Sequence, residues 1–353
     1  MIPLTWRQFR TSALVAAVVL IAVGGVLIAT GPHLAHLYRA TVGACVAGGD
    51  CSATQAAFLR HDSTLRVWLG VIVVVVPGIS GVFWGAPLVA GEMEAGTFSL
   101  AWTQSVTRTR WMATKLAVIG AASVAAAGLL SLMVTWWARS LDRVQMNQFA
   151  TFDERSIVPL GYAAFAFVLG VTAGVVLRRS LPAMAVTFVA FVATRLAFLK
   201  LLRPHLLAPS TMSIALDPVA TGFGSSGSLF SRGGPDTLQP PTPNIPNAWI
   251  TATRIVDRGG HVLTSQILTS TCPGLGDGGP PAGGAGGGPQ PVPAAAQQQL
   301  RDCVTTVGRT FHQAVTYQPA SHYWPLQWYE LALFVGAALV LSGFCLWWVR
   351  RLT

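Results

Sequence analysis

Residues 91–115 read GEMEAGTFSLAWTQSVTRTRWMATK, a polar and charge-bearing stretch between two long apolar runs. The run before it covers residues 67–89, and the run after it covers residues 112–137. Each run is long enough to cross the hydrocarbon core of a bilayer, about 30 Å thick, as a helix of about 20 residues. The stretch therefore predicts a loop on one side of a membrane that joins two consecutive spans.

The rest of the chain extends this pattern. Only 10% of the 353 residues are charged and 52% are hydrophobic, far from the roughly 25% charge of soluble domains. Four further apolar runs reach spanning length, at 11–30, 158–177, 181–199 and 328–349. We therefore expect an all-α polytopic protein of the plasma membrane with six transmembrane helices. A cleaved secretory signal is the alternative interpretation of the first run, but its length favours a retained span.

Six spans place both termini on one side of the membrane. Basic residues beside the span ends are denser on the side of the termini and of residues 91–110, so the positive-inside rule places both termini in the cytoplasm. The net charge of +10 is scattered over membrane-flanking loops. Stacking aromatic residues do not alternate with these charges, so they indicate anionic lipids as partners and not nucleic acid.

Four of the five cysteines fall in the loops expected outside the cell. Cys45 and Cys51 lie in the first outer loop and Cys272 and Cys303 in the last, while Cys345 lies within the sixth run. Two disulfides in an oxidising space, Cys45 with Cys51 and Cys272 with Cys303, are the simplest pairing of the three that four cysteines allow. Free thiols are the alternative.

A large extracellular loop is expected between spans five and six. Residues 201–326 are too polar to span, and their Gly/Pro-rich part at about 273–294 cannot bury enough apolar surface to order itself. The flanks predict some β structure, with a hairpin turning at residues 257–260 and a second ordered stretch at 304–324. The chain thus divides into spans one to five over 1–200, the lobe over 201–326, and span six with a short cytosolic tail over 327–353.

Recognisable catalytic sequence motifs are absent. The chain has no G-x-x-x-x-G-K-[ST], H-E-x-x-H or G-x-S-x-G motif, and its histidines lack the spacing of metal ligands. We therefore assign no catalytic residue, no metal and no cofactor to this chain.

Charge within the predicted spans is scarce. Arg195 near the outer end of span five and Glu330 near the outer start of span six are the candidates. Because an ion in the membrane is costly, they form a candidate ion pair at the membrane edge. The alternative is that both side chains snorkel to solvent. With so few embedded charges, a proton-coupled pump is disfavoured.

Small residues in span four predict a close helix contact. Gly170 and Gly174 form a G-x-x-x-G motif, which lets two helices approach closely. From the sequence, the contact is either within one chain or between two.

The opening stretch also carries a resemblance to a known family. Its signature residues are, in order, Glu92, Glu94, Gly96, Thr97, Ser105, Val106, Thr107, Arg108 and, at the start of the next span, Lys115. This order resembles the E-x-E-x-G-T … [PS]-[VI]-[ST]-R … K signature of type 2 ATP-binding-cassette (ABC) export permeases. The resemblance implies a six-span fold with a cytosolic coupling helix at about 91–110, which docks onto a separately encoded ATPase. Glu92, Glu94, Gly96, Thr97, Ser105 and Arg108 would then form the ATPase-coupling site.

Two other segments bear on this resemblance. MIPLTWRQFR at 1–10 resembles the elbow helix that precedes span one in these permeases, and the long loop before span six is similar to a subgroup from high-GC Gram-positive bacteria. Ser105 stands where many relatives have proline, and most have a shorter last outer loop, so the resemblance implies no substrate.

The leading hypothesis is the permease subunit of an ATP-driven exporter, acting as a homodimer or paired permease, with ATP and magnesium bound by the partner ATPase. The alternative is a membrane sensor or accessory protein whose outer lobe binds a ligand or partner and whose inner segment at 91–110 relays that state. For residues 91–110 alone, an ordinary amphipathic connector is the alternative. A membrane-embedded enzyme is the third class, and it lacks a convergent set of catalytic groups.

Overall fold

The computed structural model divides the chain into two compact units. The first consists of Met1–Leu206 with Ser321–Thr353, and the second of Leu207–Ala320. The residues described are 2–45, 51–61, 63–96, 107–145, 147–215, 231–232, 238–240, 242–243, 245–271, 298, 302–303 and 305–351. The predicted Gly/Pro-rich insert at 273–294 lies outside them.

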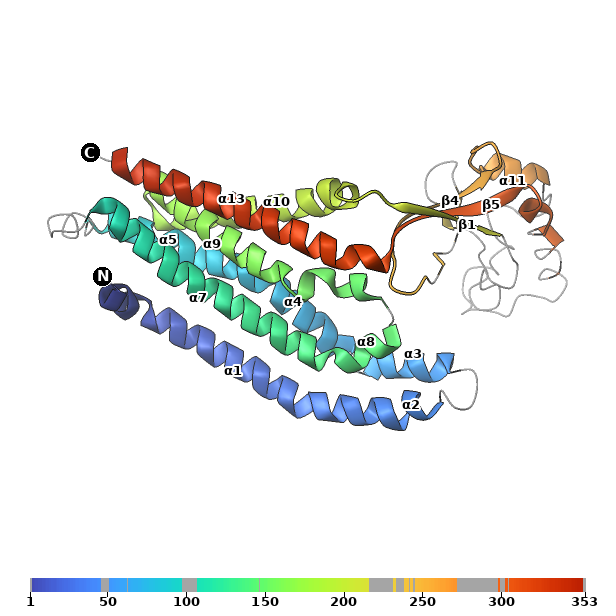
Figure 1. Cartoon of the computed structure of the whole chain (residues 1–353), viewed down its shortest axis with the longest axis horizontal. Coiled ribbons are helices and arrows are strands. Elements are labelled where there is room, and N and C mark those ends of the chain that lie inside the picture. Colours follow the sequence, from blue (N-terminus) through green and yellow to red (C-terminus); the bar gives the residue numbers. More distant parts are fainter. Residues whose placement is uncertain are drawn as a thin grey trace, which may run out of the picture. The chain divides into compact units, whose positions relative to one another are not determined.

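The first unit is a bundle of long helices (Figure 1). Its main helices are α1 (Ile2–Ala40), α4 (Ser63–Ser80), α5 (Ala86–Glu94), α7 (Arg108–Trp137), α9 (Val158–Leu177), α10 (Ser180–Ala197) and α13 (Tyr323–Arg351). Shorter helices are α2 (Val42–Cys45), α3 (Ser52–His61), α8 (Arg139–Gln145), η2 (Gln148–Glu154), η4 (Arg203–His205) and η5 (Ala320–His322).

Six segments among the described residues are long and apolar enough to cross a membrane, which confirms the predicted number of spans. They are Arg10–Cys45, Ser63–Glu94, Arg108–Trp137, Gln148–Leu177, Ser180–His205 and Ala320–Arg351. Both chain termini lie at one end of the bundle, here named the termini end, and α2, α3 and α8 lie at the opposite, distal end (Figure 1).

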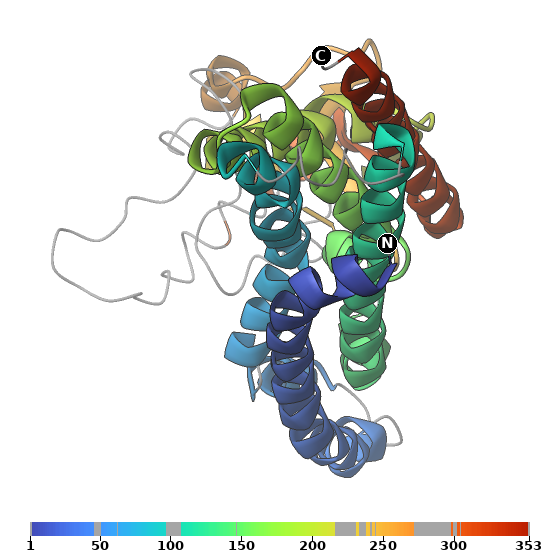
Figure 2. The same cartoon turned by 90° about the vertical axis from the view of Figure 1, so that its left-hand side faces the viewer.

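Helix α1 begins at Ile2 and continues without interruption to Ala40. Its first turns are bent away from the axis of the remainder (Figure 2). A separate elbow helix over residues 1–10 stays a prediction, because α1 is one continuous helix across these residues.

Helix α9 lies at the centre of the bundle and packs against α4, α5, α7, α10 and α13. Its sequence is apolar on all sides, as expected for a helix surrounded by other helices. Gly170 and Gly174 make the closest contact: a Cβ at Gly170 would lie 2.1 Å from the carbonyl oxygen of Gly81, and one at Gly174 would lie 2.4 Å from that of Ala86. The G-x-x-x-G motif therefore serves a contact within the chain.

Two π-helical turns interrupt the regular helices of the bundle. Span two passes from α4 into α5 through η1 (Gly81–Gly85), and α10 continues into η3 (Phe198–Leu202). Pro87 lies at the start of α5, and its nitrogen has no hydrogen to donate to the preceding turn. This missing donor accounts for an altered hydrogen-bond pattern in η1. Such turns are often found at functional sites.

The second unit contains a three-stranded antiparallel sheet in the order β1 (Ser210–Ala215), β5 (Phe311–Gln318), β4 (Trp249–Asp257). A second pair joins β2 (Ser231–Arg232) to β3 (Leu238–Gln239), and α11 covers Ser265–Thr271. The expected β structure between spans five and six is confirmed.

The predicted hairpin at 257–260 is present but short. An isolated bridge joins Val256 to Val262, the backbone N–H of Asp257 donates to the carbonyl of His261 at 3.0 Å, and that of Leu263 donates to the carbonyl of Ile255 at 2.8 Å. The ladder partner of β4 is β5. The turn itself is real: the carboxylate of Asp257 accepts hydrogen bonds from the backbone N–H groups of Gly259 and His261, both at 2.8 Å. The hydrogen bond from the His261 backbone N–H is the main reason why the pKa of Asp257 lies below its usual range.

Candidate functional site

The coupling segment predicted at 91–110 is described at both of its ends. Helix α5 runs through Glu94, and Gly96 follows with a φ of +67°, a left-handed conformation that suits glycine. Helix α7 begins at Arg108, which is half-buried, and the side chain of Thr107 caps it by accepting from the backbone N–H of Arg110 at 3.4 Å. Residues 97–106, with Thr97 and Ser105, lie outside the described part of the chain.

An ion pair ties the end of α5 to α7. The Nζ atom of Lys115 lies 2.5 Å from Oε1 of Glu92, and it also donates to the carbonyl of Leu88 at 3.4 Å. The ammonium lies 4.5 Å from the centre of the Trp111 ring, and only 3% of Lys115 is exposed. A lysine this buried needs a nearby anion, so Glu92 compensates a charge that belongs to another span.

A second contact ties the same end of α5 to α10. Oε2 of Glu94 accepts from the backbone N–H of Ser180 at 3.2 Å and from its hydroxyl at 2.9 Å. Ser180 is the first residue of α10, whose own N-cap, Arg179, provides no side-chain hydrogen bond. The Glu94 carboxylate therefore caps α10, where the helix dipole favours negative charge.

These placements change one expectation. A coupling helix over about 91–110, as the family resemblance implies, would have the two glutamates in its first turn, whereas both lie in the last turn of α5. One of them does meet a helix N-terminus, but it is that of α10. Residues 91–96 thus form a joint, named here the α5 joint, that is bonded to two other spans.

We predict that Glu92→Gln lowers the stability of the protein by about 1 to 2 kcal/mol, because it leaves the Lys115 ammonium buried without a counterion, although the glutamine carbonyl can still accept a hydrogen bond. The double variant Glu92→Gln/Lys115→Met should be more stable than Glu92→Gln, since the uncompensated charge is gone. Thermal unfolding of the detergent-purified variants measures both effects. If the loss in the double variant equalled the sum of the losses in Glu92→Gln and Lys115→Met measured singly, the pair would contribute no coupling energy.

The distal end of the bundle holds a second polar site, named here the buried charge network. Its members are Asp153, Tyr162, Arg195, Arg203 and Glu330, which come from η2, α9, α10, η4 and α13. Arg203 is central: its Nε and Nη2 donate to Glu330 at 3.0 and 2.8 Å, and its Nη1 donates to Asp153 at 3.0 Å. Arg203 is 6% exposed and Glu330 is 1% exposed, so water does not screen these contacts.

The remaining members join the two carboxylates. The Tyr162 hydroxyl lies 2.8 Å from Oδ1 of Asp153 and also contacts Glu330. The guanidinium of Arg195 stacks on the Tyr162 ring at 3.7 Å, and its Nη2 lies 3.4 Å from Asp153.

The two charges singled out from the sequence therefore lie in one network. Arg195 pairs with Asp153 and Glu330 pairs with Arg203, so Asp153, Arg203 and Tyr162 connect them. Arg195 is only 7% exposed and Glu330 only 1%. Solvated, snorkelling ends are thus excluded for both side chains.

Sequence reasoning missed Asp153, Tyr162 and Arg203 as members of this network. Asp153 and Arg203 fall just outside the apolar runs at 158–177 and 181–199. A usable signal was present: two acids and two arginines fall at the same ends of spans four, five and six, and opposite charges at one membrane depth tend to pair.

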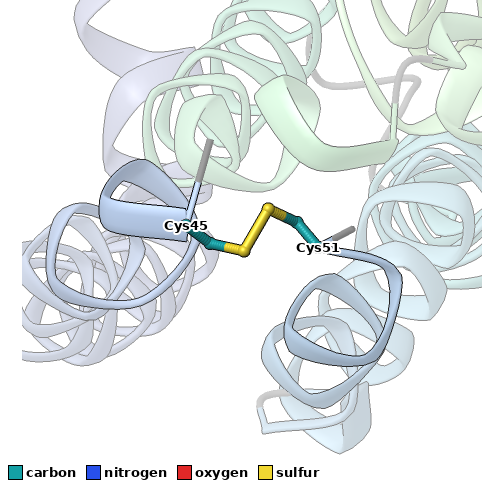
Figure 3. The surroundings of a disulfide bond; sticks show 2 residues. All are labelled: Cys45 and Cys51. Carbon is teal, nitrogen blue, oxygen red and sulfur yellow. A yellow bond between two sulfur atoms is a disulfide. The ribbon is translucent and has the colours of Figure 1, made fainter. Parts of the chain in front are cut away.

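Cys45 and Cys51 form a close pair at the distal end (Figure 3). Their sulfur atoms are 2.12 Å apart and their Cα atoms 5.8 Å apart, which is disulfide geometry. The pair connects the end of α2 to the residue before α3. Cys303 is buried, while Cys272 lies outside the described residues, so the second pairing stays a prediction.

Larger sets of metal-ligating groups do not converge elsewhere in the described residues. Within them, no three His, Cys, Asp or Glu side chains are placed to hold a metal ion. The α5 joint and the buried charge network are the polar sites that contain the residues singled out from the sequence.

Comparison with known proteins identifies the bundle. The family model described as ABC-2 membrane transporter related matches residues 17–203, more than half of the 353 residues. The match extends from within the first span nearly to the end of the fifth, and it includes the α5 joint and all of the buried charge network except Glu330. No curated protein and no solved structure matches the chain. The chain therefore belongs to the ABC-2 membrane transporter related family and is a multi-pass membrane transporter permease of the ABC-2 type.

Proposed function

We propose that this chain is the membrane-spanning subunit of an ATP-driven exporter and that residues 91–110 transmit the action of a separate ABC ATPase to the spans. The observation that carries the proposal is the α5 joint. Glu92 bonds it to α7 and Glu94 bonds it to α10. A partner that moves the segment following Gly96 would therefore act on three spans at once.

The electrostatics of the joint favour concerted movement. Separating Glu92 from Lys115 would leave a buried charge without its counterion, and separating Glu94 from Ser180 would uncap α10. Both costs are avoided when α5, α7 and α10 move together. ATP binding to the partner would then shift the bundle between two states that differ in their affinity for nucleotide and cargo.

The proposal includes the assembly and the orientation. Two copies, or one copy with a related permease, would pair with two ATPase subunits that bind ATP and magnesium. Both termini would face the cytoplasm, which places the Cys45 and Cys51 pair outside, where a disulfide persists. The long segment before span six supports membership of a subgroup from high-GC Gram-positive bacteria.

Affinity purification of the tagged chain from its native host in mild detergent tests the proposal. Mass spectrometry of the eluate should find an ATPase with a phosphate-binding loop in stoichiometric amount, and the eluate should hydrolyse ATP. Reproducible co-purification of a cytosolic partner without ATPase activity would overturn the exporter assignment and favour a sensor or accessory protein.

Two glycines of the α5 joint offer a matched pair of variants. Gly96 has a φ of +67°, whereas a Cβ at Gly91 would make only an ordinary 3.8 Å contact with the Ser180 hydroxyl. Alanine at Gly96 costs about 1 kcal/mol in that conformation, so it should redirect the chain into the coupling segment. We expect Gly96→Ala to reduce the stimulation of the partner's ATPase by the permease at least severalfold, whereas Gly91→Ala should leave it unchanged.

Stimulation is measured as the ratio of ATP hydrolysis by the complex to that by the ATPase alone, with membrane insertion of each variant checked by fluorescence size-exclusion chromatography. Equal stimulation in the two variants would contradict the coupling role of Gly96, while co-purification of the ATPase would still stand.

A further inference from the structure

Two histidines from different helices lie side by side at the distal end of the bundle. The ring centroids of His33 in α1 and His61 in α3 are 5.9 Å apart, and the two ring planes are inclined by 40°. Both residues are exposed. Within the described residues, neither ring has a hydrogen-bond or ion-pair partner. A nitrogen lone pair of each neutral imidazole is therefore available to a ligand.

Other contacts fix the two helices that carry these histidines. Tyr38 of α1 meets Phe58 of α3 edge to face, with their ring centroids 5.9 Å apart. Leu34 and Phe58 are both buried in one apolar cluster. The Cys45 and Cys51 pair also joins the end of α2 to the residue before α3. The backbones on either side of the histidine pair are thus held in place without any contribution from the histidines.

The separation of the rings suits one shared metal ion. Imidazole nitrogens bind zinc at about 2.0–2.1 Å, so the centres of two rings that share an ion lie roughly 5 to 6 Å apart. The 5.9 Å between His33 and His61 falls within this range. The χ2 angle of histidine has a broad distribution, and rotation about it can direct one nitrogen of each ring to a common point.

The position of the pair along the membrane normal gives ions access to it. His33 follows the apolar run at 11–30, and His61 precedes the run at 67–89, so both lie outside the stretches that cross the hydrocarbon core. The neighbouring cations Arg39 and Arg60 are exposed. Water and salt therefore screen their repulsion of a bound ion.

We propose that His33 and His61 form a two-histidine site for a divalent transition-metal ion of the zinc class, which links span one to the helix that leads into span two. Imidazole suits zinc, copper and nickel, whereas magnesium and calcium prefer oxygen ligands. Structural zinc sites use four protein ligands. A site with two histidines and water therefore holds an exchangeable ion, and the protein folds without it. The proposal concerns binding and does not depend on ATP coupling.

The sequence did not predict this pair. The histidines belong to α1 and α3, so they have none of the short spacings by which metal ligands are recognised along a chain. His33 and His36, which are three residues apart on α1, are the only alternative pair that includes His33 among the described histidines of that helix.

Thermal unfolding of the full-length protein in detergent, purified on a tag without histidines, tests the site. An ion that binds the folded chain more tightly than the unfolded chain raises Tm with its concentration. Zinc at about a hundredfold excess over its dissociation constant should raise Tm by roughly 5 °C, and a chelator should reverse the rise. Magnesium should have no such effect. A Tm that does not respond to zinc would overturn the proposal.

Single variants distinguish a link between two helices from a site on one. His33→Gln and His61→Gln should each remove most of the zinc-dependent rise, and the double variant should remove no more, because the link needs both rings. His36→Gln is the matched control on the same helix and should keep the rise. All three histidines are exposed, so these variants should fold, and their Tm without zinc verifies this.

Two outcomes of this series would contradict the link. Loss of the rise in His33→Gln and His36→Gln, with the rise kept in His61→Gln, would place the ion on α1 alone. An equal rise in every variant would assign the binding to other histidines, such as His261 beside Asp257.

Spectroscopy provides a second readout that does not depend on stability. Copper(II) binds nitrogen sites more tightly than zinc, and pulsed electron paramagnetic resonance counts the imidazoles that coordinate it. One equivalent of copper should show two imidazoles in the unmodified protein and in His36→Gln, and one in His33→Gln or His61→Gln. Coordination by a single imidazole in the unmodified protein would overturn the proposal, even if zinc raised Tm.

Discussion

Replacing Arg203 with methionine is expected to lower the stability of the protein by about 3 to 5 kcal/mol, the cost of leaving buried carboxylates without their counterion. The side chain of Arg203 reaches both Glu330 and Asp153, and Glu330 is 1% exposed. Methionine fills a similar volume but donates no hydrogen bond. Two carboxylates would then face each other across the Tyr162 hydroxyl, with Arg195 as the remaining cation, which lies 3.4 Å from Asp153.

Thermal unfolding in detergent, followed by fluorescence size-exclusion chromatography, measures this loss. Lys200→Met is the matched control, because Lys200 is an exposed cation three residues before Arg203, and its replacement should change stability by less than about 0.5 kcal/mol. Adding Glu330→Gln to Arg203→Met should restore part of the stability, since one uncompensated charge is removed. An Arg203→Met protein as stable as the Lys200 control would contradict the central role of this residue.

The six spans could be predicted from the sequence because spanning a bilayer depends on local properties. Length and hydropathy identify each apolar run without knowledge of its neighbours. The helices nevertheless extend beyond the apolar runs. Span two ends at Glu94 and not at residue 89, since the hydrogen bonds of α5 continue through its polar last turn.

The partners of the charged residues could not be predicted in the same way. Glu94 and Ser180 are 86 residues apart in the sequence, and Arg203 and Glu330 are 127 apart. Which charges meet depends on how the helices surround α9. The hydropathy pattern of a single helix does not indicate that arrangement.

The strand pairing of the second unit has a similar explanation. Asp257 and the two glycines after it predict a tight turn, and the turn is present. The hairpin beyond it stays short, because β5, more than 50 residues later, offers β4 a longer partner than the short segment at Val262. Local turn chemistry fixes the turn, whereas the number of ladder hydrogen bonds selects the partner strand.

Gly170→Ala is expected to destabilise the bundle by about 3 kcal/mol, although alanine is normally the better helix former. The added Cβ would lie 2.1 Å from the carbonyl oxygen of Gly81 and 2.8 Å from the backbone nitrogen of Ala86. Both neighbours are backbone atoms, so no side chain can rotate away. Helix α9 would have to separate from η1 and α5 by about 1 Å to reach ordinary contact distances.

The same substitution at Gly343 provides the control. Gly343 lies within α13, is exposed, and has no atom within 4 Å of an added Cβ. There alanine should stabilise the helix by up to about 1 kcal/mol. Thermal unfolding should therefore move in opposite directions for two chemically identical changes. A shift of the same sign in both variants would show that helix propensity, and not the contact of α9 with η1 and α5, governs the response. Because η1 leads directly into α5, we also expect Gly170→Ala to weaken ATPase stimulation, whereas Gly343→Ala should preserve it.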